Sequence, residues 1–478
     1  MKILMAASEC MPFVKTGGLA DVVGALPNKL AEMGEDVRVV LPLYRDIPAK
    51  WRDKMEHVLY FYVHLGWRRQ YCGVEKLVYN KVTYYFLDNE YYFDRPYIYG
   101  LGGDEGERYV FFSRAVLEML SRVEFIPDVI HCHDWQTGLV PILLNAQYRT
   151  LPPYRDIRTV FTIHNLQYQG VFPIQEIEDY LGLGDWAYSS DNLEFYGQCS
   201  FMKGALRFAD QITTVSPTYA QEIRTIYYGE RLDGMIRARG ADVTGVLNGI
   251  DTQWYDPRRD TEIKANYSAD TFENKKINTR ALREELGLEQ DESVPVIGLV
   301  TRLSSQKGLD LIECVLSEIM DTGVQVALLG KGEERYEQLF DWAQWKYAGR
   351  LAARIEMNQA LSHRIYAGSD MFLMPSKFEP CGLSQLIALR YGTLPIVRET
   401  GGLRDTVLSY NQFTGDGNGF TFLNYNAHDM LHVVERAVKL WKEEPETWKK
   451  LARRAMGEVY DWNRSAKTYQ EVYKKAMK

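Results

Sequence analysis

The sequence predicts an α/β protein built from two doubly wound, Rossmann-like domains. Short runs rich in β-branched residues alternate with helical patterns along the chain, which is typical of parallel βαβ units. Several of the strand runs are apolar at consecutive positions, as expected when helices cover both faces of a sheet. The length of 478 residues exceeds the size at which one hydrophobic core keeps growing, so we expect two domains.

The first series of strand patterns lies in the N-terminal half of the chain. The expected strands span residues 2–6, 37–41, 82–87, 129–132, 159–163, 211–215 and 243–247. Helical patterns such as 22–33 and 107–121 lie between them. A second series follows, with expected strands at 296–300, 324–329, 354–357, 371–374 and 394–397. Each series is long enough to form its own sheet.

A polar segment, residues 251–291, separates the two series and places the domain boundary near its start. We therefore expect an N-terminal domain at 1–250 and a C-terminal domain at 251–460, which face each other across a cleft. The last residues, 461–478, are amphipathic and helical in pattern, and we expect them to pack back on the N-terminal domain.

Composition and charge exclude several classes of protein. The net charge of −8 argues against a nucleic-acid partner, because phosphate binding needs a basic face. No window approaches the roughly 20 apolar residues of a membrane span. The six cysteines are scattered without a C-x-x-C pair, and the short apolar start reads as a strand and not as a signal segment. We expect a cytoplasmic protein with no membrane contact.

The segment 378–385, Phe-Glu-Pro-Cys-Gly-Leu-Ser-Gln, is the most informative motif. It follows the expected strand 371–374 and precedes an apolar helical pattern at 386–389. Glu379 and the Cys381-Gly382 pair therefore lie beyond a strand's carboxyl end, where open α/β sheets bind ligands. Free N–H groups at a helix start suit anionic or hydroxyl-rich ligands. The alternative is a capped strand-to-helix turn with a solvated carboxylate.

Two further loops carry cations after expected strands. Lys15 precedes the pair Gly17-Gly18 at a helix start, which suits phosphate, although a plain junction with a surface lysine fits the same pattern. Arg302 and Lys307 bracket a hydroxyl-rich turn and could neutralise a diphosphate, or could be surface cations. Neither loop has the spacing of a dinucleotide fingerprint or a Walker A motif.

Histidines end two neighbouring strand patterns in the first half. His131-Cys132-His133-Asp134 ends one, and His164 ends the next. Strand alternation places Cys132 on the opposite face from the two histidines, and no second cluster has metal-like spacing, so a zinc site is not expected. No acidic D-x-D follows a strand, so a metal-chelated diphosphate is not expected either. Asp134, His164 and the adjoining asparagine instead suit sugar hydroxyls at the cleft rim.

In family order, these motifs resemble the starch synthase family, which includes the bacterial glycogen synthases. The matching segments are Lys-Thr-Gly-Gly-Leu-Ala-Asp-Val at 15–22, His-Asp-Trp at 133–135, Thr-Ile-His-Asn at 162–165, Leu-Asn-Gly-Ile-Asp at 247–251, Arg-Leu-Ser-Ser-Gln-Lys-Gly at 302–308, Ser-His-Arg-Ile at 362–365 and Glu-Pro-Cys-Gly-Leu at 379–383. They run from one end of the chain to the other. The resemblance implies a GT-B fold and retaining glucosyl transfer from ADP-glucose to an α-1,4-glucan such as glycogen, with no metal and no pyridoxal phosphate.

The resemblance also implies residue roles. It assigns catalysis to His164, Glu379, Arg302 and Lys307. It assigns the donor ADP-glucose to Lys15, Gly17, Gly18, Arg302, Lys307, Glu379, Cys381, Gly382 and Leu383, and the acceptor or other sugar contacts to Tyr97, Asp134, Trp135, Asn165 and Asn248.

Two positions depart from patterns seen in related enzymes. Many retaining GT-B enzymes carry a second Glu eight residues after the first, where this chain has Ile387, as is typical of the starch synthase family. A Gly-Tyr pair often precedes the Ser-His-Arg-Ile segment, with its Tyr beside adenine, and here those positions are Glu356 and Met357. Methionine can pack on a base, but it leaves the choice between ADP- and UDP-glucose open.

Three other functions were weighed against glucosyl transfer on the basis of the sequence. An α-glucan phosphorylase shares the two-domain layout but needs pyridoxal phosphate and a far longer chain. A non-catalytic glucan- or nucleotide-sugar-binding protein would not need Lys15, His164, Arg302, Lys307 and Glu379 together. A nicotinamide dehydrogenase would need a glycine fingerprint that is missing here.

Overall fold

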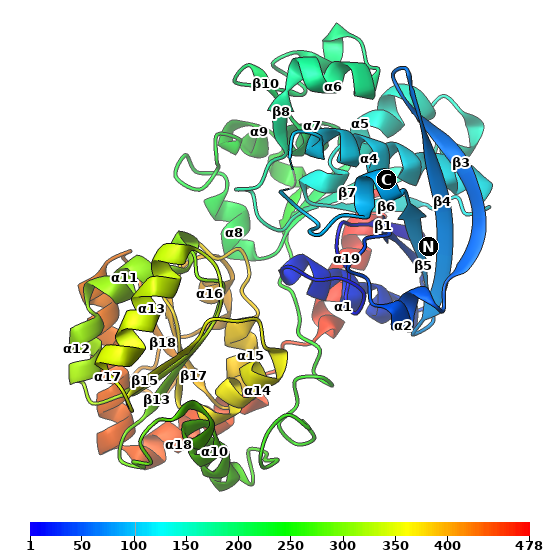
Figure 1. Cartoon of the computed structure of the whole chain (residues 1–478). Helices are drawn as coiled ribbons and strands as arrows, with labels where there is room; N and C mark the ends of the chain where they lie inside the picture. The colour runs from blue at the N-terminus through cyan, green and yellow to red at the C-terminus, as the bar shows by residue number, and fades with distance from the viewer. Residues whose placement is uncertain (101) are drawn as a thin grey trace. The chain divides into compact units, whose positions relative to one another are not determined.

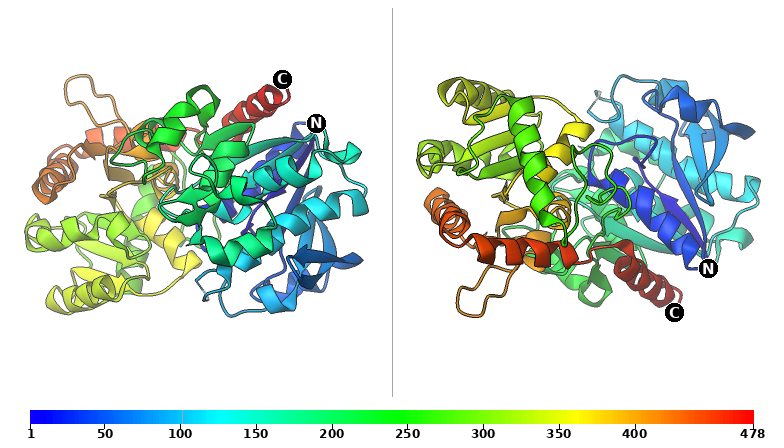
Figure 2. Two further views of the ribbon diagram at one scale, coloured as in Figure 1. Left: turned by 90° about the horizontal axis from the view of Figure 1, so that it is seen from above. Right: turned by 90° about the horizontal axis from the view of Figure 1, so that it is seen from below.

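The computed structural model describes residues 1–100 and 102–478, which form two compact units (Figure 1). Unit 1 contains Met1–Asn248 together with Trp462–Lys478, and unit 2 contains Gly249–Asp461. Each unit has its own buried apolar core. Each core surrounds a sheet that is mostly parallel in unit 1 and fully parallel in unit 2, with helices against both of the sheet's faces (Figure 2).

Unit 1 is built on a nine-stranded sheet. Its order is β12 (Val243–Gly245), β11 (Gln211–Thr214), β7 (Arg158–Ile163), β6 (Val129–His133), β1 (Lys2–Ala6), β2 (Asp36–Pro42), β5 (Val82–Asp88), β4 (Arg68–Tyr79) and β3 (Glu56–Leu65). All neighbours pair in parallel except β4, which is antiparallel to both β5 and β3. A small antiparallel sheet adds β8 (Val171–Pro173), β10 (Gln198–Ser200) and β9 (Glu194–Phe195).

The helices of unit 1 follow the strands in the βαβ manner. They are α1 (Gly18–Glu32), α2 (Ala49–Arg52), α3 (Glu90–Phe93), α4 (Glu105–Arg122), α5 (Val140–Leu143), α6 (Ile174–Leu181), α7 (Phe201–Phe208), α8 (Pro217–Glu222) and α9 (Asp233–Ala238). The two helical patterns expected at 22–33 and 107–121 correspond to α1 and α4, and most of the α4 side chains are buried.

The C-terminal helix α19 (Trp462–Ala476) belongs to unit 1 and packs beside α1, β7 and β11. Its apolar face buries Trp462, Tyr469 and Tyr473 in the core of that unit. Ser465 Oγ donates to the carbonyl of Leu247, which ties the start of the helix to the end of the unit's first segment.

Unit 2 is built on a six-stranded, fully parallel sheet. Its order is β15 (Leu351–Arg354), β14 (Gln325–Leu329), β13 (Val296–Val300), β16 (Met371–Met374), β17 (Leu394–Arg398) and β18 (Phe420–Phe422). Its helices are α10 (Lys275–Leu286), α11 (Leu309–Cys314), α12 (Leu316–Asp321), α13 (Glu334–Lys346), α14 (Gln359–Gly368), α15 (Ser384–Arg390), α16 (Gly401–Thr406), α17 (Ala427–Glu443) and α18 (Pro445–Gly457).

Three details of the sequence prediction need correction or addition. The strand expected at 354–357 was wrong, because β15 is Leu351–Arg354: its first three residues are buried, whereas Met357 is 82% exposed. The sequence interpretation also omitted β3 and β4, which follow one another in an antiparallel ribbon, and β18. Along β3, buried Phe61, Val63 and Leu65 alternate with exposed polar and aromatic residues, a pattern unlike the continuous apolar runs of the parallel strands.

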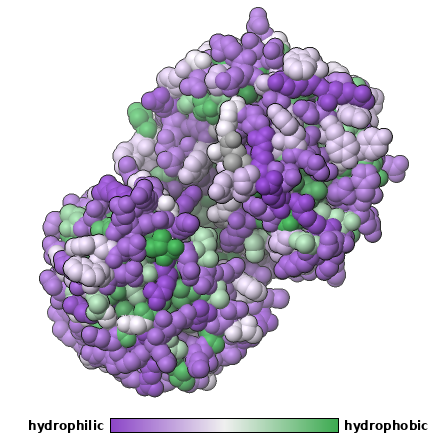
Figure 3. Space-filling model, viewed as in Figure 1, coloured by the Kyte–Doolittle hydropathy of each residue, from purple (hydrophilic) through white to green (hydrophobic). Residues whose placement is uncertain are grey.

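Hydrophilic side chains predominate on the face of the molecule seen in Figure 3. Among the described residues, no helix is both long and apolar enough to cross a lipid bilayer.

Candidate active site

The strand order of unit 2 places the predicted donor residues of that unit at one point of the sheet. The strands run in the order 3-2-1-4-5-6 of their sequence, so the direction of winding reverses between β13 and β16. Loops that leave the carboxyl ends of these two strands diverge there, which is where doubly wound sheets bind ligands. Arg302 and Lys307 follow β13, and Glu379 to Leu383 follow β16.

Lys307 and Glu379 meet at this switch point. Lys307 Nζ lies 2.6 Å from Glu379 Oε2, and Ser376 Oγ donates to the same oxygen at 3.1 Å. The side chains are 18% and 8% exposed, so the pair is largely withdrawn from water. Arg302, by contrast, is exposed, and its guanidinium has no hydrogen-bond or ion-pair partner in the described part of the chain. The Lys307–Glu379 ion pair and the available cation of Arg302 therefore lie in the loops at the carboxyl ends of β13 and β16.

The Cys-Gly-Leu turn after Glu379 has an unusual backbone that depends on glycine. Gly382 has φ +73°, and Gln385 Nε2 donates to the carbonyls of Cys381 and Gly382 at 3.0 Å each. No described acceptor takes the N–H groups of Gly382 and Leu383, which precede α15. The turn thus leaves two amide donors available in the loop that follows Glu379.

Residues that the sequence interpretation missed hold this loop in place. Gly401 has φ +45°, and a Cβ there would lie 1.9 Å from the carbonyl oxygen of Glu379. Arg398, at the end of β17, donates through Nε to the carbonyl of Ser376 at 2.9 Å and also bonds the carbonyl of Lys377. Arg398 could have been found from the sequence, because it is a charged residue at the end of a buried strand. Nothing in the sequence indicated that it would bond the carbonyls of Ser376 and Lys377.

Unit 1 has an equivalent switch point. Counted outward from β1, β2 and β5 lie on one side and β6, β7, β11 and β12 on the other, so winding reverses between β1 and β6. The loop after β1 carries Lys15 and Gly17, and the loop after β6 carries Asp134.

Lys15 lies in this first loop beside a cavity of about 420 Å³. The cavity is also lined by Tyr97, whose ring is 67% exposed, and by Tyr99. Lys15 Nζ pairs with Asp21 Oδ1 at 2.7 Å, and both side chains keep partial contact with solvent. The structure therefore brings together two predicted residues, Lys15 and Tyr97, that are far apart in the sequence.

Glu9 organises the same loop and was missed from the sequence. It is 3% exposed, and its Oε2 accepts the backbone N–H groups of Thr16 at 2.5 Å and Gly17 at 3.1 Å. Its Oε1 accepts the hydroxyls of Thr16 and Tyr99. The Gly17 amide is thus taken by a carboxylate of the chain itself, while Gly18 begins α1 with an N–H that no described acceptor takes.

Asp134 has a strained backbone at the end of β6. Its φ of 56° and ψ of −179° lie in a region that is almost restricted to glycine, and such strain costs on the order of 1–3 kcal/mol. Its carboxylate accepts the N–H of His164 at 2.7 Å. Burial raises the pKa of Asp134 to about 7, although the N–H groups of His164 and Asn165 oppose that rise. Strain and a shifted carboxyl pKa together are typical of functional sites.

Three histidine rings gather beside Asp134. The rings of His131 and His133 lie 4.1 Å apart, and His133 Nδ1 lies 3.0 Å from His164 Nε2. Burial lowers the pKa of both His131 and His164 to about 3, so their rings are neutral at physiological pH. Cys132 is buried between the two histidines on β6, and the described residues include no group of three or more His, Cys, Asp or Glu arranged to hold a metal ion.

The other predicted sugar-site residues lie in different environments. Trp135 is 8% exposed and packs edge-on against Tyr109, so its indole is mostly a core group. Asn165 Oδ1 accepts the N–H of Gln167 in a local turn. Asn248, the last residue of unit 1's first segment, is 6% exposed and has a buried Oδ1 for which the described residues offer no hydrogen-bond partner.

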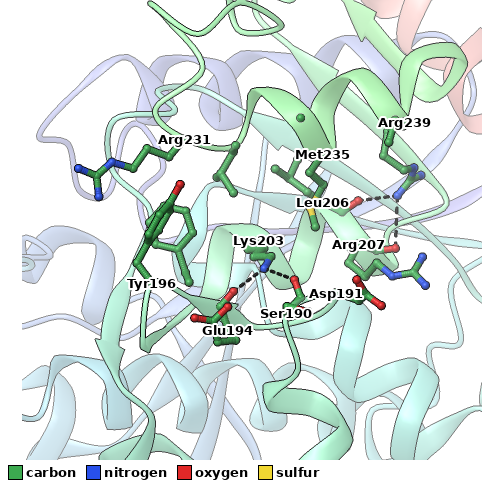
Figure 4. Close-up of a pocket in the computed structure, with 14 residues that line it drawn as sticks. Ser190, Asp191, Glu194, Tyr196, Lys203, Leu206, Arg207, Arg231, Met235 and Arg239 are labelled. Atoms are coloured by element: carbon green, nitrogen blue, oxygen red, sulfur yellow. Dashed lines mark hydrogen bonds between the residues drawn. The ribbon is translucent and has the colours of Figure 1, made fainter.

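A second cavity in unit 1, of about 620 Å³, contains none of the predicted site residues (Figure 4). Lys203 is one of its lining residues, and its Nζ donates to the carbonyls of Ser190 at 2.5 Å and Glu194. Arg239 bonds the carbonyl of Leu206 at 2.6 Å. Burial lowers the pKa of Lys203. The two cations therefore tie the cavity's walls to backbone carbonyls.

Comparison with known proteins identifies the family. Residues 2–238 match the starch synthase catalytic domain, and residues 281–455 match the glycosyl transferases group 1 domain. Glycogen synthase of Geobacillus thermodenitrificans is 55% identical over 478 residues, which cover 100% of this chain and 98% of that protein. The chain belongs to the starch synthase family. Glycogen synthase of Anoxybacillus flavithermus is 53% identical over 477 residues, and the match covers 100% of this chain and 98% of that protein.

A solved structure agrees with this assignment. The catalytic domain of starch synthase IV from Arabidopsis thaliana, bound to ADP and acarbose, is 34% identical, with a TM-score of 0.93 over 100% of this chain and 99% of that one. The predicted GT-B fold with two Rossmann-like domains is confirmed, and so is the predicted membership of the starch synthase family. Like the glycogen synthases it matches, the chain is a glycosyltransferase.

Proposed function

We propose that the chain transfers glucose from ADP-glucose to the non-reducing 4-hydroxyl of an α-1,4-glucan, with retention of configuration. The observation that carries the proposal is the Lys307–Glu379 pair, together with the N–H groups of Gly382 and Leu383 in the same loop, which no described acceptor takes. Cations suit a diphosphate, whereas a carboxylate and N–H groups suit sugar hydroxyls, and both kinds of group lie at one switch point. The related starch synthase IV, bound to ADP and acarbose, supports these two ligand classes.

On this proposal, the groups of unit 2 hold the donor. Arg302 and Lys307 stabilise the negative charge that develops on the diphosphate as it leaves. Glu379 accepts a hydrogen bond from the donor glucose, and the backbone N–H groups at Cys381, Gly382 and Leu383 bind its other hydroxyls. Because Glu379 is already hydrogen-bonded to Lys307 and Ser376, its carboxylate is fixed in orientation before a sugar binds.

The groups of unit 1 act on phosphate and sugar. Lys15, with the backbone of Gly17 and Gly18, approaches the diphosphate, and His164 lies beside the transferring glucosyl group. The proposed acceptor and sugar contacts are Tyr97, Asp134, Trp135, Asn165 and Asn248. In the structure, Lys15 is paired with Asp21 and the Gly17 N–H is bonded to Glu9. To bind the diphosphate, these two groups exchange the carboxylates for phosphate oxygens.

Retention is proposed to proceed without a covalent intermediate. Retaining glycosidases use a second carboxylate as nucleophile, but Glu379 is held by two donors and Asp134 by backbone N–H groups. An oxocarbenium-like transition state would instead be stabilised electrostatically, and the departing diphosphate would take the proton of the acceptor hydroxyl on the same face. Neither a metal ion nor pyridoxal phosphate is needed for this route.

A labelled-glucose assay tests the proposal. Incorporation into glycogen is measured from ADP-glucose and UDP-glucose in turn, with and without EDTA, and the product is digested with β-amylase. We expect a higher kcat/KM with ADP-glucose, little effect of EDTA, and release of labelled maltose, which requires new α-1,4 linkages. Equal or better use of UDP-glucose contradicts the donor assignment, and complete loss with EDTA, restored by a divalent metal, contradicts the assignment of charge to Arg302 and Lys307.

A further inference from the structure

His133 and His164 form a direct contact between neighbouring strands. His133 is the last residue of β6 and is fully buried, and His164 follows the last residue of β7. Although 31 residues separate them, His133 Nδ1 lies 3.0 Å from His164 Nε2, with the rings 5.3 Å apart. Parallel pairing of His133 with Thr162 sets this distance.

The position of the shared proton follows from the other nitrogen of His133. A hydrogen bond between two neutral imidazoles needs one N–H donor and one bare nitrogen. His133 Nε2 is buried and has no partner among residues 1–100 and 102–478. If Nδ1 were the bare nitrogen, the proton would reside on Nε2 as a buried N–H without a described acceptor. Among buried backbone groups, an N–H without an acceptor is rarer than an under-satisfied acceptor, and the same preference applied to the ring leaves Nε2 bare. The proton therefore resides on His133 Nδ1 and is donated to His164 Nε2.

This arrangement determines the tautomer of His164. Because Nε2 accepts, the proton of the neutral His164 ring resides on Nδ1, and no described residue bonds that nitrogen. The contacts of the neighbouring His131 agree with a bond between His133 and His164. His131 uses both of its nitrogens elsewhere, with Tyr473 at 2.9 Å and Thr162 at 2.6 Å, so it does not compete for His133.

We propose that His133 is a positioning residue that fixes His164 as an Nδ1–H hydrogen-bond donor, so that His164 donates to a ligand oxygen and does not act as a proton acceptor. The backbone of His164 is fixed separately, by the Asp134 carboxylate at 2.7 Å. The kinetic consequence rests on the proposed role of His164 beside the transferring glucosyl group. The tautomer itself does not depend on that role.

The direct test is nitrogen-15 NMR of the full chain with labelled histidine. Long-range proton–nitrogen correlations distinguish a protonated from a bare ring nitrogen, and loss of signals in His164→Asn and His133→Asn assigns the two rings. We expect a protonated Nδ1 and a bare Nε2 in His164. A His164 ring protonated at Nε2 overturns the proposal, whether or not the protein transfers glucose.

The kinetic test compares three substitutions at one position. His133→Phe keeps a planar ring but removes the donor, and we expect kcat to fall on the order of 10- to 100-fold while ADP affinity is unchanged. His133→Asn keeps an amide N–H near the Nδ1 position and should retain kcat within a few-fold. His64→Phe, which changes an exposed histidine on β3, is the control and should match the wild type.

A double-mutant cycle separates this role from a merely structural one. If His133 acts through His164, His133→Phe should reduce kcat little further in a His164→Ala background. Equal losses for His133→Asn and His133→Phe in folded protein, or additive losses in the cycle, overturn the positioning role. Full activity of His164→Ala would instead contradict the role proposed for His164, with the tautomer still decided by NMR.

Discussion

Lys307 Nζ and Glu379 Oε2 lie 2.6 Å apart, although 72 residues separate them in the chain. This ion pair joins the loop after β13 to the loop after β16 at the point where the sheet of unit 2 reverses its winding. The two residues are proposed to contact different parts of the donor, yet each is also the partner of the other. Substitutions at one position therefore act on both groups.

The ion pair predicts different defects for its two members. Glu379→Gln replaces a charge-assisted hydrogen bond to the glucosyl group, worth roughly 1.5–3 kcal/mol, by a neutral one worth roughly 0.5–1.5 kcal/mol, and leaves Lys307 without its competing carboxylate. We expect kcat to fall by more than KM rises, with ADP affinity retained or increased. Lys307→Met should lower kcat by about two to three orders of magnitude and weaken ADP binding.

These outcomes are measured by ADP titration calorimetry beside steady-state kinetics. Lys439→Met, on the exposed side of α17, is the control. Loss of ADP affinity in Glu379→Gln as severe as in Lys307→Met, without unfolding, would mean that Glu379 contacts the nucleotide and not the sugar.

Gly17→Ala tests whether the loop after β1 must stay bare for a ligand. Gly17 has φ −151°, and a Cβ there meets no atom of a described residue within 4 Å, so the described part of the fold can accept alanine. We expect the melting temperature to stay within about 1 °C of the wild type while kcat/KM for ADP-glucose falls at least tenfold, because a methyl group would separate the backbone from the diphosphate. Gly240→Ala, also in open space, is the control; unchanged activity in Gly17→Ala would argue against close ligand approach.

Gly401→Ala should damage both the fold and the site. Its φ of +45° disfavours alanine by roughly 1–2 kcal/mol, and its Cβ would lie 1.9 Å from the carbonyl oxygen of Glu379. We expect a lower melting temperature, and lost glucosyl transfer even at temperatures where the variant stays folded. Thermal unfolding and activity assays check this, with Gly457→Ala as a control that meets no neighbouring atom. Wild-type activity in Gly401→Ala would show that the position of Glu379 tolerates movement.

His131 predicts acid sensitivity of the fold. Burial lowers its pKa to about 3, below the unfolded value near 6.5, so its contribution to stability is present above pH 6.5 and is lost as the pH falls toward 3. At pH 5.5 the loss is roughly 1.4 kcal/mol. The difference in unfolding free energy between the wild type and His131→Gln should therefore shrink by about this amount between pH 7.5 and 5.5.

Urea unfolding at both pH values measures this difference, and His64→Gln, which changes an exposed histidine on β3, is the control. An unchanged difference for His131→Gln would show that His131 keeps an ordinary pKa in the folded protein.

The sequence determined the strands that carry the site and most of the residues at their ends. β1, β13 and β16 begin and end where their apolar runs predict, because strands buried on both faces require consecutive apolar residues and end where polar groups begin. That regularity was enough to point to Lys15, Arg302 and Glu379. The search for consecutive apolar residues missed β3 and β4, because their residues alternate between core and solvent.

Only the tertiary structure decided which of these residues meet. Strand order, and with it the two switch points, depends on pairing between segments far apart in the chain, so the Lys307–Glu379 pair and the His133–His164 contact had no local signal. The supporting contacts of Glu9, Gln385 and Arg398 arise in the same way. Protonation was likewise decided by packing, because burial, and not residue type, keeps His164 neutral and raises the pKa of Asp134 to about 7.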